Sequence, residues 1–464
     1  MTEIRHPDQL PFFMNKMKAA GLQPVVMDAF ACYYEKVVSG DRGLIYNRDI
    51  RPVDPSEILH MENLTGFADA GSRARSRTVM IVLNGGLGTS MGLTGPKSLL
   101  TVRNGQSFLE MIVRLAEKKS VRLAFMNSFN THEATLAALT AIDPKPFPCL
   151  FVQNRFPKIF QHGLAPAVWP QNPDLEWNPP GHGDIYTALV ASGVLQQLLD
   201  EGIRYALIAN SDNLGATLDD ALLGYFSEKR LPFMMEVSQR QPVDFKGGHL
   251  AVHSTGRLIL REVAQCPEDE LDISRDIAQY QYFNTNNIWV NLEFLNEMIG
   301  SHGAVILPMI LNPKTIDPRD ESSPPVYQIE SAMGSAIFMF EGAAAVKVPR
   351  TRFFPVKKCN ELLAIRSDRF DYYDETGFQL NPELSSDNNI VIQLDSRYYG
   401  KIDQFEARFP FGAPSLKYCD SLKVTGDVVF GRDVELKGDV EIVSERSQQM
   451  RIPDEALVEG VIYL

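Results

Sequence analysis

The sequence predicts an α/β fold with a mixed, largely parallel sheet, an N-terminal helical segment and a C-terminal hexapeptide-type β-helix. Short aliphatic runs alternate with helical segments from residue 78 to about 375, which is typical of βαβ units. A glycine-rich loop follows the first of these runs, and a six-residue repeat occupies the tail. We therefore divide the chain into residues 1–76, 77–380 and 381–464.

Length, charge and cysteine usage exclude several classes of protein. With 464 residues, of which 44% are hydrophobic, the chain can form about three well-packed domains. Its net charge of −13 argues against general nucleic-acid binding, which needs a basic face. The five cysteines lack metal-site spacing and suit a reducing compartment, and no stretch is apolar enough for a membrane span or a signal peptide. We expect a cytoplasmic protein that binds neither nucleic acid nor membrane.

Local patterns predict the elements of each segment. Residues 1–76 have apolar positions at roughly helical spacing, so we expect helices packed on the next domain. Strands are expected at 79–83, 121–128, 149–153, 205–210, 335–340 and 345–350, with a helix from about Thr131. In such sheets, ligands bind beyond the carboxyl ends of the strands.

The tail repeats with a period of six residues. Two aliphatic series follow this step, at Leu422, Val428, Val434 and Val440 and at Val424, Phe430, Leu436 and Ile442. Paired aliphatic residues at this period are the pattern of a hexapeptide β-helix, although a chance series of short strands remains the alternative. With about four rungs, such a solenoid needs capping by the main domain or by another subunit.

The glycine-rich loop indicates a phosphate site. After the predicted strand at 79–83 come Asn84, Gly85, Gly86 and Gly88, and Lys97 lies at the end of the turn. Glycines allow backbone N–H groups to approach an anion, and the lysine adds a positive charge. The spacing fits neither a Walker A loop, because Pro96 separates Gly95 from Lys97, nor a dinucleotide G-x-G-x-x-G loop. Together these features predict a triphosphate cradle.

The form LNGGLGTSMG…GPKS resembles the nucleotidyltransferases that make nucleotide sugars. More narrowly, it resembles the UTP–glucose-1-phosphate uridylyltransferase family, also called UDP-glucose pyrophosphorylases, of the eukaryotic type. The resemblance extends from about residue 78 to the C-terminus. It implies a Rossmann-like nucleotidyltransferase domain, and it implies nucleotide binding by Leu83, Asn84, Gly85, Gly86 and Lys97. It also implies a small C-terminal β-helix domain that can mediate homo-oligomerisation.

Two later motifs add to the nucleotide site. Gln153 closes a predicted strand, and its amide can donate to and accept from one pyrimidine edge, although a plain turn residue is the alternative. In the resembling family a glutamine here contacts uracil. In PPGHGD, backbone groups at Gly181 can read a base, and His182 can donate to a sugar or phosphate oxygen. The alternative for His182 is a capping or turn histidine.

Asp212 is the predicted Mg²⁺ ligand. It follows the predicted strand at 205–210, and Mg²⁺ is usually held by one or two carboxylates with phosphate oxygens and water. From the residues alone an Asx-turn is equally compatible, but NSDNLGAT matches the family's N-x-DNLGAT. Asn210 and Asn213 are expected to give polar support or to contact substrate, and we count Asn210 and Asp212 with the sugar site. The sequence identifies no second metal carboxylate.

Amide-rich and acidic positions predict the rest of the sugar site. Asp244 to Gly248 resembles the family's D-x-KGG loop, and Asn286 and Asn287 belong to an amide- and hydroxyl-rich stretch suited to sugar hydroxyls. Glu330 can accept from a sugar hydroxyl, although an acid at a helix N-terminus is almost as compatible.

The second expected catalytic residue, beside Lys97, is Lys357. In the family the corresponding lysine reaches the phosphates. Here it is followed by Lys358-Cys359-Asn360-Glu361, where the family usually has two threonines, serine and aspartate. Because this sequence differs from the family's pattern, it does not determine the hydrogen bonding around Lys357, and Lys358 could compete for the role of Lys357.

The resemblance implies that UTP and glucose 1-phosphate are converted to UDP-glucose and pyrophosphate with Mg²⁺. The attacking phosphate oxygen is already an anion, so positioning and charge neutralisation should suffice without a general base. Three alternatives stay open: another sugar 1-phosphate such as galactose or N-acetylglucosamine, a thymidylyl- or cytidylyltransferase, and a non-catalytic nucleotide-sugar-binding protein.

Overall fold

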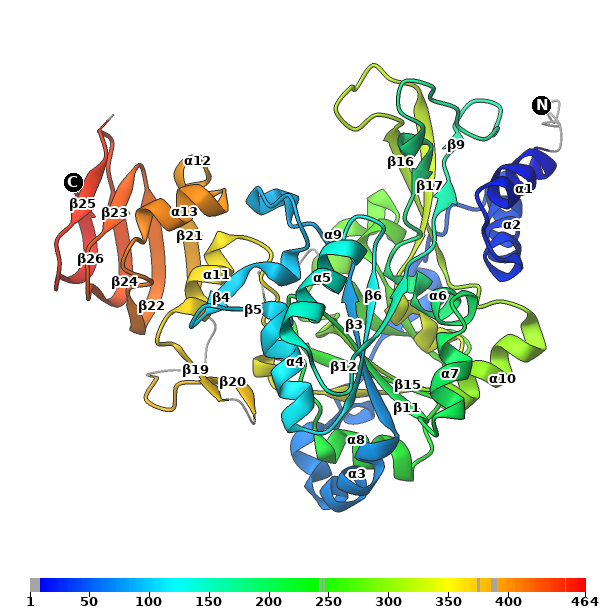
Figure 1. The fold of residues 1–464 in the computed structure, drawn as a ribbon, viewed down its shortest axis with the longest axis horizontal. Helices are drawn as coiled ribbons and strands as arrows, with labels where there is room; N and C mark the ends of the chain where they lie inside the picture. The colour runs from blue at the N-terminus through cyan, green and yellow to red at the C-terminus, as the bar shows by residue number, and fades with distance from the viewer. Residues whose placement is uncertain (1–8, 242–243, 245–246, 374–375, 385–389, 447) are drawn as a thin grey trace.

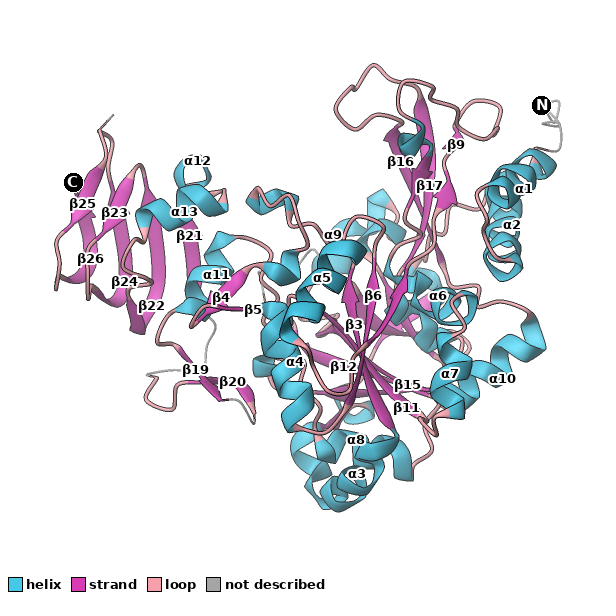
Figure 2. Ribbon diagram, viewed as in Figure 1, coloured by secondary structure: helices cyan, strands magenta, loops and turns pink. Residues whose placement is uncertain are grey.

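Figure 1 shows the chain as a computed structural model, which describes residues 9–241, 244, 247–373, 376–384, 390–446 and 448–464. A central sheet with helices on both faces forms the middle of the molecule (Figure 2). The C-terminal sheets lie at one end, and the hairpin of α1 (Leu10–Ala19) and α2 (Pro24–Val38) lies at the other (Figure 1).

The central sheet is mixed and largely parallel, as predicted. Within the described residues its main path runs β2-β18-β12-β15-β11-β3-β6-β7, where β15 is antiparallel to both neighbours and the other pairs are parallel. These strands are β2 (Leu59–His60), β18 (Ala344–Lys347), β12 (Phe233–Gln239), β15 (Tyr282–Asn291), β11 (Tyr205–Asn210), β3 (Thr78–Asn84), β6 (Arg122–Asn127) and β7 (Cys149–Val152). An antiparallel extension is made by β1 (Ile50–Pro52), β13 (His249–His253) and β14 (Leu258–Arg261).

Helices cover both faces of the sheet, and strands such as β3 are buried at every position. Met80 and Val82 pack on one face with α4 (Phe108–Lys118) and α8 (Asp220–Glu228). Val79 and Ile81 pack on the other face with α6 (Ile185–Ala191), α7 (Val194–Asp200) and α10 (Leu292–His302). Strands buried on both faces read as continuous hydrophobic runs rather than as alternating patterns.

The N-terminal segment is mostly helical, as predicted, but it also supplies strands β1 and β2 to the central sheet. The α1–α2 hairpin packs through Phe13 and Phe30 onto Phe156 and the side sheet β16-β17-β9. That side sheet consists of β9 (Ile159–Phe160), β16 (Met309–Thr315) and β17 (Pro325–Ser331). Within the described residues, the hairpin therefore packs directly on the side sheet and not on the glycine-rich loop.

The prediction of a strand at 335–340 is wrong. Residues 335–338 lie in a 3₁₀ helix at Met333–Phe338, in which Ala336 and Ile337 are buried, and residues 339–340 follow the end of that helix. A short apolar run that is fully buried can be strand or helix, and periodicity alone does not distinguish the two.

The C-terminal repeat forms two parallel sheets. One has the order β21-β22-β24-β26 and the other pairs β23 with β25. All eight residues of the two aliphatic series are at most 2% exposed. Leu422 pairs with Val440 and Val424 with Ile442, so the register advances by three repeats between β22 and β24. The strands are β21 (Val391–Leu394), β22 (Ser415–Thr425), β23 (Val428–Phe430), β24 (Glu435–Val443), β25 (Met450–Ile452) and β26 (Leu457–Tyr463).

The remaining elements connect these layers. They are α3 (Ala68–Ala74), α5 (His132–Ile142), α9 (Leu271–Arg275), α11 (Cys359–Arg366), α12 (Ser396–Tyr399), α13 (Ile402–Arg408), β4 (Thr101–Arg103), β5 (Gln106–Ser107), β8 (Phe156–Pro157), β10 (Trp177–Asn178), β19 (Phe370–Tyr373) and β20 (Gly377–Leu380). One hydrophobic cluster continues from α4 through α11 into the C-terminal sheets. In the part of the chain that the structure describes, every helix is too short or too polar to cross a bilayer.

Candidate active site

The predicted site residues begin at the carboxyl ends of neighbouring strands. Asn210 at the end of β11 lies beside Leu83 in β3, and Asn84 at the end of β3 lies beside Asn127 in β6. Because these strands are parallel, the segments that follow them emerge at the same edge of the sheet. The glycine-rich loop and the Asp212 segment are therefore brought together by the topology.

The glycine-rich loop is closed by a backbone hydrogen bond from Lys97 N to Gly86 O, of 2.9 Å. Gly88 has φ +62°, and a Cβ there would lie 2.7 Å from a Leu93 methyl carbon, so this position favours glycine. At Gly85 a Cβ would lie 3.5–3.6 Å from the Gln153 amide, which is an ordinary van der Waals distance. The structure thus brings Gln153 beside the loop, as a shared nucleotide site requires.

Asp212 holds both predicted catalytic lysines. Its Oδ2 accepts from Lys97 Nζ at 2.7 Å and from Lys357 Nζ at 3.0 Å. Burial acts to raise the pKa of Asp212, but Lys357 and Lys97 outweigh it and hold this pKa below its usual value. Residues 97, 212 and 357 are far apart in the sequence, so this cluster of charges is a product of the fold.

Asp212 has a second carboxylate oxygen, Oδ1, with which neither lysine forms a hydrogen bond. Oδ1 is buried and has no hydrogen-bond partner among the described residues. The described residues contain no group of three or more His, Cys, Asp or Glu side chains that could hold a metal ion by themselves. One buried carboxylate oxygen fits Mg²⁺, which commonly takes one or two carboxylates and completes its shell with phosphate oxygens and water.

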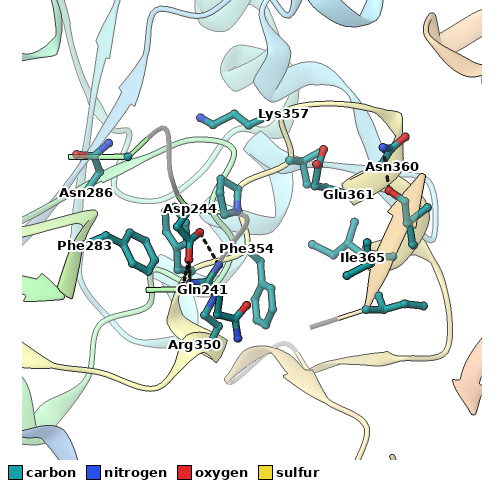
Figure 3. A pocket seen from close by; sticks show the side chains of 18 of the residues that line it. Gln241, Asp244, Phe283, Asn286, Arg350, Phe354, Lys357, Asn360, Glu361 and Ile365 are labelled. Atoms are coloured by element: carbon teal, nitrogen blue, oxygen red, sulfur yellow. Dashed lines mark hydrogen bonds and ion pairs between the residues drawn. The ribbon is translucent and has the colours of Figure 1, made fainter. Parts of the chain in front are cut away.

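A cavity of about 620 Å³ adjoins this cluster, and His182, Asn286 and Lys357 are among the residues that line it. In Figure 3 the amine end of Lys357 points to the side where Asn286 lies, and Ile365 lies on the opposite side. Asp244, the first residue of the predicted D-x-KGG loop, forms a two-point ion pair with Arg350 at 2.6 and 2.8 Å. Phe245 and Lys246 of that loop lie outside the described residues.

His182 faces the cavity as a neutral imidazole. Burial, with a smaller contribution from Lys357, lowers its pKa to about 4. Its Nδ1 lies 3.1 Å from the Met333 N–H and accepts from it, which leaves Nε2–H as a donor. A donor of this kind can bind a sugar or phosphate oxygen without titrating near neutral pH.

Gly181 fits closely against strand β17. It has φ +78°, and a Cβ there would lie 2.5 Å from Ser331 O and 3.3 Å from Glu330 Cβ. The contact is reinforced by a hydrogen bond of 2.8 Å from Ser331 N to Pro180 O. Glu330 thus lies beside the PPGHGD segment, and burial raises the pKa of its carboxyl group.

Two predicted ligands have side chains already engaged by protein. The Asn84 amide donates to Asn127 Oδ1 at 2.8 Å and to Thr135 Oγ1 at 2.9 Å. Asn287 is fully buried, and its amide donates to Glu236 Oε2 at 3.0 Å and to Arg352 O at 3.2 Å. Their backbones remain near the site, but these contacts indicate that the side chains stabilise the site rather than line it.

Three buried charged groups near the site are absent from the sequence-based prediction. Glu236 and Arg352 form a buried ion pair beneath the Lys357 segment. Asp184 accepts from Asn154 N at 2.6 Å and from Asn154 Nδ2 at 2.9 Å, and burial raises its pKa to about 7. Asp184 lies inside PPGHGD, so that motif offered a signal for it, whereas Glu236 lies in an ordinary apolar strand run.

Comparison with known proteins assigns the family. The sequence model of a family described as UTP–glucose-1-phosphate uridylyltransferase matches residues 27–437. The chain belongs to this family. Among uridylyltransferase relatives, a probable UTP–glucose-1-phosphate uridylyltransferase of Schizosaccharomyces pombe is 35% identical over 94% of this chain and 87% of its own length. The Solanum tuberosum enzyme is 39% identical over 82% of this chain and 80% of its own length.

Solved structures of UDP-glucose pyrophosphorylases have the same fold. A Leishmania major mutant enzyme in complex with UDP-glucose superposes with a TM-score of 0.92 at 39% identity, covering 99% of this chain and 100% of that one. A protein described as UDP-glucose phosphorylase, from Trypanosoma brucei, gives a TM-score of 0.85 at 40% identity, covering 99% of this chain and 100% of that one. The resemblance first seen in the glycine-rich loop therefore extends over the whole chain.

Proposed function

We propose that this chain is a uridylyltransferase that converts UTP and glucose 1-phosphate to UDP-glucose and pyrophosphate. Family membership supports this proposal, and the observation that carries it is the convergence of Lys97, Asp212 and Lys357 beside the glycine-rich loop. In the reaction a phosphate oxygen of glucose 1-phosphate attacks the α-phosphorus of UTP. The bond from that phosphorus to the β-phosphate bridge oxygen breaks, and pyrophosphate leaves.

The residues divide this task by charge and position. The loop N–H groups and Lys97 hold the triphosphate, with Gln153 and Gly181 at the base. Lys357 offsets negative charge on the attacking phosphate and in the transition state. His182 donates through Nε2 to a sugar or phosphate oxygen, and Asn286 and Glu330 face sugar hydroxyls. No general base is needed, because the attacking oxygen is already ionised.

We also propose that Asp212 binds Mg²⁺ through its buried Oδ1. When bound there with phosphate oxygens, the cation would neutralise charge on the triphosphate. The lysine contacts at Oδ2 leave Oδ1 for this role, which supports the assignment. Asn210, at the end of the same strand, would help to orient the Asp212 segment toward the sugar phosphate.

Coupled detection of pyrophosphate tests the function. The full chain with Mg²⁺ should release pyrophosphate from UTP with glucose 1-phosphate at least about tenfold faster than with galactose or N-acetylglucosamine 1-phosphate. CTP and dTTP should be poor replacements for UTP. Equal rates with all three sugar 1-phosphates would contradict the glucose assignment. If no combination of nucleotide and sugar 1-phosphate released pyrophosphate, the proposed activity would be refuted in favour of a non-catalytic nucleotide-sugar-binding protein.

We infer further that the C-terminal segment is a short β-helix through which copies of the chain associate. The register of three repeats between β22 and β24 and the burial of all eight repeat residues support the β-helix. Strand β26 lies at the edge of its sheet, where Leu457, Val461 and Tyr463 are 54–79% exposed. Analytical ultracentrifugation of wild type and Val461→Lys tests the association, which the lysine should weaken; a wild-type monomer at all concentrations would contradict it.

The five cysteines are all free thiols in the structure, which supports a cytoplasmic location. Fractionation of cells that express the chain should place it with cytoplasmic marker proteins. Recovery with an oxidising compartment would contradict this inference.

A further inference from the structure

A buried ion pair lies beneath the segment that ends in Lys357. Arg352 Nε donates to Glu236 Oε2 at 2.7 Å, and Nη2 donates to Oε1 at 2.8 Å. The Glu236 side chain is 0% exposed and that of Arg352 is 7% exposed. The same carboxylate also accepts from Trp289 Nε1 at 2.9 Å and from Asn287 Nδ2 at 3.0 Å. All four donors are thus directed at one fully buried carboxylate.

Stability alone gives a weak reason for such an arrangement. The free energy needed to remove two charges from water offsets much of their Coulombic attraction. Apolar side chains of similar volume often stabilise a core equally well. A buried, fully hydrogen-bonded pair does, however, allow only one relative placement of the elements that carry it. Here those elements are strand β12, strand β15 and the segment that leads to Lys357.

Backbone contacts connect Arg352 to the Asp212 segment. Arg352 O accepts from Asn213 Nδ2 at 3.1 Å, and Asn213 Oδ1 accepts from Phe354 N at 2.8 Å. Two residues further on, Val356 N donates to Asp212 O at 3.1 Å. Alternate residues from 352 to 356 are therefore fastened to Asp212 and Asn213.

A glycine allows this close approach. A Cβ on Gly215 would lie 2.6 Å from Thr351 O and 2.8 Å from the carbonyl carbon of Arg352. The Arg352 guanidinium also donates to Thr217 O at 2.9 Å. The segment after Asp212 and the segment before Lys357 thus pack backbone against backbone.

Lys357 depends on this support more than Lys97 does. The Lys357 side chain is 59% exposed, and it forms a 3.0 Å ion pair with Asp212. The Lys97 side chain is 12% exposed and is held by the closed glycine-rich loop. A long, exposed side chain is placed mainly by its backbone, so the backbone at 352–356 sets where the Lys357 ammonium lies.

We propose that Arg352 and Glu236 are positioning residues for Lys357. Neither is among the described residues that line the cavity, so they act through the 352–356 segment rather than by touching substrate. Their ion pair fixes that segment against Asp212 and Asn213, and thereby fixes the Lys357 ammonium at the transferring phosphate. This inference rests on the uridylyl transfer proposed above.

Arg352→Lys tests the inference because lysine keeps the charge but cannot form the two-point contact. Misplacing a catalytic group by about 1 Å can cost on the order of 100-fold in rate. We expect kcat to fall by between about tenfold and 100-fold. The KM for UTP should stay within about twofold of wild type, because the loop and Lys97 are untouched.

Arg408→Lys is the matched control. Arg408 makes the same kind of two-point pair with Asp427, at 2.9 and 3.0 Å, and is part-buried in α13, away from the cavity. Arg408→Lys should lower the thermal unfolding temperature about as much as Arg352→Lys does, and it should leave kcat unchanged. A fall in kcat as large as that of Arg352→Lys would show that any lost Arg–carboxylate pair has this effect, and would overturn the inference.

A double-mutant cycle supplies the decisive readout. If Arg352 acts through Lys357, Arg352→Lys should cost less than about twofold in kcat when Lys357→Ala is already present. If the two losses multiply, Arg352 does not act through Lys357 and the inference fails. Wild type without pyrophosphate release would instead refute the proposed function, so the two failures are distinguishable.

Trp289→Phe keeps the inference testable if Arg352→Lys does not fold. It retains most of the aromatic volume and removes only one of the four donors to Glu236. We expect a smaller loss of kcat, which should again disappear in the Lys357→Ala background. A loss that persists there would contradict the positioning role.

Discussion

Replacing Gly181 by alanine should separate close packing from backbone strain. Gly181 has φ +78° and ψ 176°, a region that essentially only glycine adopts, and alanine there costs about 1–3 kcal/mol. The added Cβ would also lie 2.5 Å from Ser331 O. Relieving that contact means moving the segment from β17, which sacrifices the 2.8 Å bond from Ser331 N to Pro180 O, a loss of about 1 kcal/mol.

Gly193→Ala is the comparison variant. Gly193 has φ +77°, but no atom lies within 4 Å of the position its Cβ would take. Its ψ of −1° places it in the left-handed helical region, so alanine there costs about 1–2 kcal/mol and creates no clash. The free energy of unfolding of Gly181→Ala should therefore be about 2 kcal/mol lower than that of Gly193→Ala. This corresponds to an unfolding temperature that is lower by roughly 4–8 °C for a unit of 150–250 residues.

Thermal unfolding and UTP kinetics measure this difference. If Gly181→Ala relieves the clash by shifting the PPGHGD segment, His182 and the base site shift with it, and the KM for UTP should rise at least about tenfold. Gly193→Ala should leave that KM unchanged. If the two variants matched in both unfolding temperature and KM, the close packing of Gly181 on β17 would have no functional role.

Three further results are expected. Lys97→Ala should lower turnover by about 100-fold or more, because it removes a preorganised charge at the triphosphate, and near-normal turnover in steady-state assays would refute the cradle. The rate defect of Asp212→Asn should shrink as Mg²⁺ is raised, whereas that of Lys357→Ala should not; the reverse result in a Mg²⁺ titration would exchange their roles. Burial raises the pKa of Asp184 to about 7 in the folded chain, so its stabilising contribution should be lost as pH rises from about 4 through 7. Asp184→Asn, which cannot ionise, should therefore gain unfolding temperature relative to wild type between pH 5 and 8, and a constant difference would contradict the raised pKa.

The sequence was sufficient for features that depend on local pattern. The strand and glycine-rich loop at 79–95, the edge position of Asp212 and the six-residue repeat all follow from local spacing, and the structure has strands β3 and β11 where they were expected. The resemblance implied that Lys97 and Lys357 both reach the phosphates, but their pairing with Asp212 was not predicted, because no local signal connects residues 97, 212 and 357.

Other features depend on contacts between distant segments. Nothing in the apolar strand around Glu236 indicates that it pairs with Arg352, 116 residues later in the chain. The amide of Asn287 had the right chemistry for a sugar, but the same chemistry lets it bind Glu236, and the fold buries it there. Side-chain amides are equally suited to ligand and to protein partners, so composition alone could not choose between them.

UTP labelled on different phosphorus atoms distinguishes uridylyl transfer from other reactions of the triphosphate. The full chain is incubated with Mg²⁺ and glucose 1-phosphate, together with UTP that is radiolabelled on the α-phosphorus in one reaction and on the γ-phosphorus in another. Uridylyl transfer predicts that the α-label appears in UDP-glucose and the γ-label in pyrophosphate, both only when glucose 1-phosphate is present and both greatly reduced in Lys357→Ala. Appearance of the γ-label on the sugar phosphate, or release of the α-label as free UMP, would contradict uridylyl transfer.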